Sequence, residues 1–162
     1  MIAPAPAKWL IGGLVLAYGL AMVWIASSVL FSLNMKPVIM NWTVLALSLG
    51  AVLSALPLQR PRVSALAIGA ALPLVMAVAV WILAQLFAYK GDGGSVAGSE
   101  LLWALRMIAM AVALCGSMSL AGTVAGQMLQ ARLQLPPRAM LVAGLAVTAV
   151  TLVLVALRYP EI

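Results

Sequence analysis

Long hydrophobic runs separated by short polar segments dominate the pattern of this chain. Five such runs are present, at residues 9–33, 38–58, 63–89, 101–129 and 139–157. Each holds about the 20 apolar residues that a helix needs to cross a hydrocarbon core of roughly 30 Å. The pattern therefore predicts an all-α fold, that of a polytopic integral membrane protein. We expect a bundle of about five transmembrane helices that forms a single domain over residues 1–162.

The segments between the runs are rich in residues that end helices. Gln-Arg-Pro-Arg at residues 59–62 follows the second run, and the glycine-rich KGDGGSVAGS at residues 90–99 follows the third. Pro136 and Pro137 stop the fourth helix, because proline lacks a backbone N–H and its ring clashes with the preceding turn. The first run is too long for a usual signal peptide and no clean cleavage site follows it, which favours a retained span.

Composition agrees with a lipid environment. Hydrophobic residues make up 66% of the chain and charged residues 7%, whereas a soluble domain has about 25% charged residues. The formal net charge of +6 does not predict nucleic-acid binding, because the basic residues are scattered and no aromatic residues alternate with them to stack on bases. The lipid bilayer is therefore the expected surrounding, and nucleic acid is not an expected partner.

The basic residues of the short loops predict the orientation. With five spans, the side of the N-terminus carries Lys8, Arg60, Arg62, Arg132 and Arg138. The other side carries Lys36, Lys90, Arg106 and Arg158. Because cytoplasmic loops hold an excess of Lys and Arg, this small difference predicts a cytoplasmic N-terminus. The short loops and the spans rich in Ala, Leu and Val favour the cell (inner) membrane of a bacterium.

The usual catalytic groups are scarce. The chain has no histidine, which excludes histidine-ligated haem or zinc and a histidine general base. Its three carboxylates, Asp92, Glu100 and Glu161, do not form a pair on one helix face. No glycine-rich phosphate loop with a lysine is present. We therefore expect a protein that is not an enzyme and that carries no cofactor.

Sulfur-containing side chains lie along one side of the fourth predicted helix. At about 100° per residue, they fall within an arc of roughly 140°, and they are Met107, Met110, Cys115 and Met118. Thioether and thiolate groups are ligands of Cu(I), so a copper site is one interpretation. Their spread over more than one turn prevents one ion from reaching all four, and Met and Cys also serve as apolar filling. The sequence favours filling, and no metal is expected.

Small residues crowd the second half of the same helix, among them Gly116, Gly122 and Gly126. Gly122 and Gly126 form a Gly-x-x-x-Gly motif, which lets two helix backbones approach closely in lipid. The contact lies either within the bundle or against another subunit. The sequence favours packing within the bundle.

Three further residues are candidates for a transport path. Pro73 interrupts the third predicted helix, Gln85 lies near its end, and Arg106 lies two turns into the fourth. Prolines are tolerated in membrane helices, and an arginine near a helix end extends to the headgroups. We therefore interpret Arg106 as interfacial rather than buried.

The expected function is that of a non-enzymatic integral membrane protein. It is an accessory or structural subunit that acts through contacts with other transmembrane helices, in a homo- or hetero-oligomer. One alternative is a small transporter or channel formed by oligomerisation, with Pro73, Gln85 and Arg106 near its path. The other is a Cu(I)-handling membrane protein.

Overall fold

The computed structural model of the chain describes residues 5–30, 35–88 and 98–158. These residues form five helices and no strand, which confirms the predicted all-α membrane class. The helices are α1 (Ala5–Leu30), α2 (Met35–Ser54), α3 (Pro61–Ala88), α4 (Gly98–Leu133) and α5 (Pro137–Arg158).

Three of the helices contain stretches that are long and apolar enough to cross a membrane: Pro61–Val78 of α3, Leu105–Leu133 of α4 and Pro137–Arg158 of α5. The apolar stretches of α1 and α2 within the described residues, Trp9–Ile25 and Val38–Ser54, are shorter. The protein is therefore a transmembrane protein, and five crossings remain a prediction.

The helix ends differ from the ends of the hydrophobic runs where local backbone chemistry intervenes. α2 ends at Ser54, before the end of its run at Leu58. Pro57 cannot continue an α-helix, and the N–H groups of Ala55 and Leu56 bond instead to carbonyls three residues earlier. α4, in contrast, extends past the end of its hydrophobic run, to Leu133. It ends where Gln134 adopts a left-handed φ of 49°, a usual helix cap.

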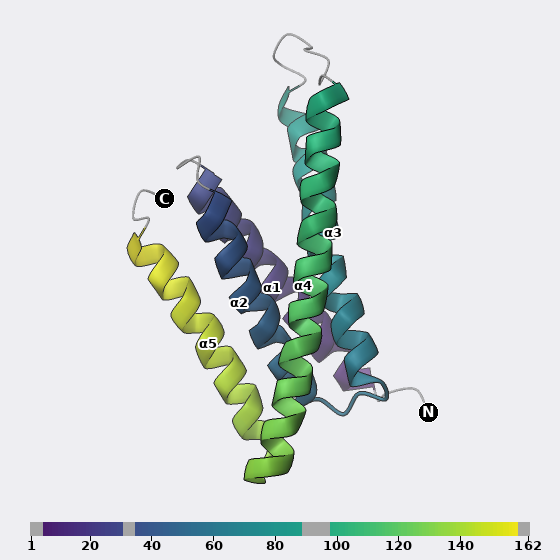
Figure 1. The fold of residues 1–162 in the computed structure, drawn as a ribbon, viewed down its shortest axis with the longest axis vertical. Helices are drawn as coiled ribbons and strands as arrows, with labels where there is room; N and C mark the ends of the chain where they lie inside the picture. Colours follow the sequence, from purple (N-terminus) through teal and green to yellow (C-terminus); the bar gives the residue numbers. More distant parts are fainter. Residues whose placement is uncertain (1–4, 31–34, 89–97, 159–162) are drawn as a thin grey trace.

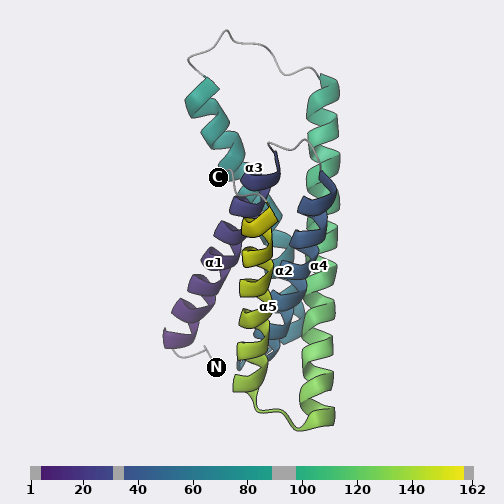
Figure 2. The same cartoon turned by 90° about the vertical axis from the view of Figure 1, so that its left-hand side faces the viewer.

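α2 lies at the centre of the bundle and packs against each of the other four helices (Figures 1 and 2). α4 packs mainly against α2 and α3, and α5 packs mainly against α2. The core is accordingly richest in side chains of α2, with contributions from every other helix. Its largest fully buried members include Tyr18, Met22, Ile25, Leu45, Leu49 and Leu53.

The start of α1, the α2–α3 connection and the α4–α5 connection lie at one end of the molecule in both views (Figures 1 and 2). We call this the basic end, because its segments carry Arg60, Arg62, Arg132 and Arg138. α5 ends with Arg158 at the opposite end. The fold thus groups the loop arginines as the alternation of spans predicts.

Candidate helix-contact site

The tightest glycine contacts between described helices join α4 to α2. A Cβ atom at Gly122 would overlap the carbonyl oxygen of Leu47, and a Cβ atom at Gly50 would overlap the carbonyl oxygen of Ser119. In both places a side chain would collide with backbone, which cannot rotate away. Glycine on both helices is what lets the two backbones come this close.

A hydrogen bond between the helices accompanies this approach. Thr123 Oγ1 lies 2.9 Å from the carbonyl oxygen of Gly50 and 3.0 Å from that of Ser119 in its own helix. Its single proton is shared between the two acceptors or alternates between them. Because the group is fully buried in a membrane helix, this bond adds about 1 kcal/mol to the α2–α4 contact.

The same face of α4 also packs closely against α3. A Cβ atom at Gly69 of α3 would lie 2.6 Å from the carbonyl oxygen of Cys115, and one at Gly116 would lie 3.3 Å from the Cβ atom of Ala70. Gly126 faces the Ser54 side chain of α2. The structure therefore places Gly116, Gly122 and Gly126 against helices of the same chain, which is the first of the two arrangements that the sequence leaves open.

Three hydroxyl groups from α1, α2 and α5 form a second, partly buried cluster, which the sequence does not indicate. Tyr18 OH lies 2.7 Å from Thr148 Oγ1 and 3.3 Å from Ser48 Oγ. Thr148 Oγ1 and Ser48 Oγ lie 2.9 Å apart. The carbonyls of Leu45 and Gly144 offer two further acceptors. Three protons are thus available for five short contacts, so several hydrogen-bond arrangements are close in energy. This hydroxyl cluster joins α1 directly to α5 and joins both of them to α2.

The sulfur-containing candidates do not converge. Cys115 is fully buried on the bundle side of α4, whereas Met110 is 52% exposed and Met107 and Met118 are half-buried. The described residues contain no group of three His, Cys, Asp or Glu side chains suited to a metal ion. The geometry therefore separates Cys115 from Met110 rather than bringing them to one ion.

Two of the three transport-path candidates can be placed, and they lie in different surroundings. Pro73 is buried inside α3, and Arg106 is exposed on the outside of α4. The side chain of Gln85 lies outside the described residues. Arg106 is not enclosed by the described helices of its own chain, and its interfacial position stays a prediction.

The outward side of α4 carries a second row of small residues. We call it the outer face, and it consists of Ala109, Ala113, Ser117, Ala121 and Ala125, all exposed and each four residues from the next. Between Met110 and Met128, a fully described stretch, the large hydrophobic side chains of α4 are half-buried rather than fully exposed, as at Leu114, Met118 and Leu120. The exposed side of α5, in contrast, carries Val142, Leu145, Val150 and Leu154 among others. α4 is thus unlike a helix that faces only lipid tails.

Comparison with known proteins gives no relative from which the role of these sites could be inferred. The chain matches no protein-family model, no curated protein and no solved structure.

Proposed function

We propose that the chain is a non-enzymatic, multi-pass subunit of the cell membrane that joins other transmembrane helices through the outer face of α4. In this proposal the chain crosses the membrane five times, with the N-terminus and the basic end in the cytoplasm. The excess of loop arginines at that end supports the orientation. The short connections beyond the helices at that end, residues 55–60 and 134–136, favour contacts made within the bilayer.

The observation that carries the proposal is the spacing and exposure of the outer face. Lipid tails are as apolar as leucine, so helices associate in a membrane through close packing and hydrogen bonds rather than through the hydrophobic effect. Small side chains at every fourth position allow such packing over several turns. α4 already uses this principle on its inward side, where Gly122 lies against α2. Its outer face is suited to receive one more helix.

Ser117 adds a polar group to this face. Its hydroxyl now donates to the carbonyl of Leu114 in the same helix, over 3.0 Å, and it is exposed. Thr123 shows that a hydroxyl of α4 can reach a carbonyl of its own helix and one of a neighbour at the same time. The expected occupant is therefore an apolar transmembrane helix that presents small residues and a carbonyl near Ser117.

Cross-linking in native membranes tests this proposal. The variant Ser117→Cys, in a Cys115→Ser background, should form a cross-linked product with a second polypeptide when a short thiol-reactive linker is added. Ala146→Cys in the same background is the control, because Ala146 is an exposed small residue on α5, among large aliphatic neighbours. Mass spectrometry of the product identifies the partner. If Ser117→Cys gives no more product than Ala146→Cys, the outer face is not a docking surface.

A small transporter or channel formed by oligomerisation is the second candidate. The hydroxyl cluster of Tyr18, Ser48 and Thr148 is the observation that favours it, because these groups would offer hydrogen bonds to a polar solute that passes between α1, α2 and α5. A cross-linked product that consists of two copies of this chain, together with solute flux into proteoliposomes, would support this candidate over the first. Cu(I) handling gains no support from the separate placements of Cys115 and Met110.

A further inference from the structure

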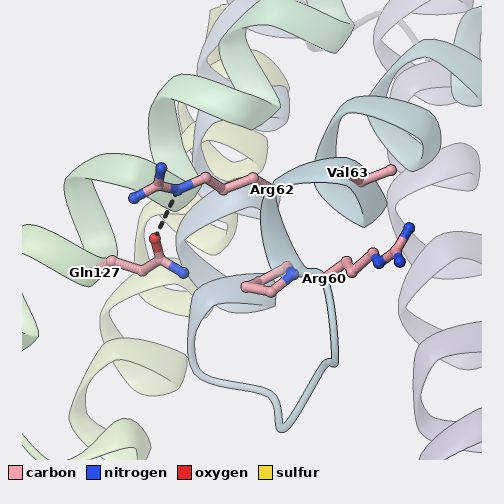
Figure 3. Close-up of a pocket in the computed structure, with 5 residues that line it drawn as sticks. Arg60, Arg62, Val63 and Gln127 are labelled. Carbon is pink, nitrogen blue, oxygen red and sulfur yellow. Dashed lines mark hydrogen bonds between the residues drawn. The ribbon is translucent and has the colours of Figure 1, made fainter.

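An open surface pocket of about 300 Å³ lies at the basic end, lined by Arg60, Pro61, Arg62, Val63 and Gln127 (Figure 3). Arg62, at the start of α3, points toward α4, where its Nε donates to Gln127 Oε1 over 3.2 Å. Arg60 extends to the opposite side, toward α1 (Figure 3). The pocket thus has the guanidinium group of Arg62 and the carboxamide of Gln127 on its α4 side, whereas the guanidinium group of Arg60 lies on the α1 side.

No acidic residue of the chain lies near these cations in the sequence. Asp92 follows α3, Glu100 lies in the first turn of α4, and Glu161 follows α5. Those three helix ends lie opposite the basic end (Figure 1). Arg132, in the last turn of α4, and Arg138, in the first turn of α5, add further positive charge to the basic end. An anion from outside the chain is therefore the natural counter-charge.

The donors of the pocket suit a phosphate group. Gln127 holds Arg62 through Nε, which leaves the two Nη groups of Arg62 and the Nε2 group of Gln127 to donate to a ligand. The planar fork of a guanidinium matches the oxygens of a phosphate, and fixing one edge of it in place lowers the entropy lost on binding.

The apolar surroundings distinguish a lipid from a free anion. Val63, in the lining, is 60% exposed, and Leu66, one turn further along α3, is 45% exposed. Both belong to the stretch Pro61–Val78, which is long and apolar enough to span a membrane. A phosphate held by Arg62 would therefore have the apolar side chain of Leu66 on its membrane side, with Val63 on the α1 side of the same turn.

We propose that this pocket binds the headgroup of an anionic phospholipid. Arg62 and Gln127 hold the phosphate, Arg60 adds attraction from the other side of the start of α3, and the acyl chains lie along Val63 and Leu66. Pockets of this kind, between the ends of membrane helices, are typical sites for anionic headgroups. The inference does not depend on the outer face of α4 or on the proposed function.

Lipid binding to the full chain in a neutral maltoside detergent tests the proposal. Native mass spectrometry would measure how much phosphatidylglycerol, compared with phosphatidylcholine, the protein retains. We expect a preference for phosphatidylglycerol that falls about fivefold in Arg62→Gln, as is usual for one basic residue at an anionic surface. Arg60→Gln should lower it less, because the Arg60 side chain lies on the α1 side of the pocket. Arg62→Lys keeps the charge but loses the fork and the bond from Nε, so it should also bind more weakly than the parent.

Arg158→Gln is the matched control, because it removes one exposed arginine from the opposite end of the molecule. It should retain phosphatidylglycerol as the parent does, and melting curves check that every variant is folded. Equal losses in Arg62→Gln and Arg158→Gln would overturn the proposal. Full binding by Arg62→Lys would mean that positive charge alone attracts the lipid, without a specific pocket, and would also overturn the proposal. Displacement of the lipid by millimolar inorganic phosphate would identify free phosphate as the ligand and overturn the lipid assignment.

Discussion

Thr123 of α4 donates a hydrogen bond to the backbone carbonyl of Gly50 in α2, over 2.9 Å, at the place where the two helices come closest. Gly50 has no side chain to cover its carbonyl, and Thr123 has a hydroxyl that reaches it. The close approach and the hydrogen bond therefore depend on each other. Stability of the bundle should respond to both.

Thr123→Val tests the hydrogen bond. Valine has nearly the same shape as threonine but no hydroxyl, so the packing stays while the bond to Gly50 is lost. We expect the free energy of unfolding in detergent to fall by about 1 kcal/mol. Thr123→Ser keeps the hydroxyl but removes a buried methyl group, so its loss of stability reports on packing rather than on the bond. If Thr123→Val unfolds like the parent, the bond does not stabilise the contact.

Gly50→Ala tests the close approach. The added methyl group would overlap the carbonyl oxygen of Ser119, so the two helices must separate. Overpacking of this kind typically costs about 1–3 kcal/mol, and we expect a lower Tm. Gly12→Ala is the control, because a Cβ atom at Gly12 of α1 meets nothing within 4 Å. That variant should melt like the parent or slightly higher, since alanine is the better helix former.

The hydroxyl cluster should show coupling between α1 and α5. Tyr18→Phe and Thr148→Val each remove one partner of the 2.7 Å contact and preserve the shape of the side chain. Because each change breaks the same bond, the double variant should lose less stability than the sum of the two single variants, by about 0.5–1 kcal/mol. Additive losses, measured by unfolding in detergent, would mean that the two hydroxyls do not interact.

The number and approximate positions of the described helices can be predicted from the sequence. The hydrophobic runs locate α1 to α5 because a membrane span needs a minimum length of apolar residues. Pro136 and Pro137 limit how far α4 can extend, and α4 ends shortly before them, at Leu133. The early end of α2 was not predicted. Its cause is Pro57, which lies inside the hydrophobic run. A hydrophobicity pattern cannot reveal this end, because proline is apolar and yet breaks the helix.

The contacts between helices depend on information that no single run contains. α4 has small residues on two sides, and only the placement of α2 reveals that Gly122 lies inside and Ala121 outside. The hydroxyl cluster joins residues 30, 100 and 130 positions apart, each isolated among apolar neighbours. The pairing of such residues follows from the register and rotation of the helices, which depend on the packing of all five.

Arg106→Gln should have little effect on folding. Arg106 is exposed on the outside of α4 at the start of the stretch Leu105–Leu133, where its side chain can extend to the headgroups. Surface changes of this kind usually shift stability by less than about 0.5 kcal/mol. Thermal melting in detergent checks this, and a large loss would mean that Arg106 has a buried partner in the membrane.

The last prediction contrasts two neighbouring residues of α4. Gly122→Leu places a large side chain against the carbonyl of Leu47, so it should separate α2 from α4 and lower the Tm strongly, or prevent folding. Ala121→Leu places the same side chain on the outer face, where Ala121 is exposed. This variant should melt like the parent in detergent. In membranes, however, it should lose the cross-linked product that Ser117→Cys gives, because the leucine fills the space of the partner helix. The reverse result, with Ala121→Leu unstable and Gly122→Leu normal, would exchange the inner and outer sides of α4 and refute both the packing of the bundle and the proposed docking surface.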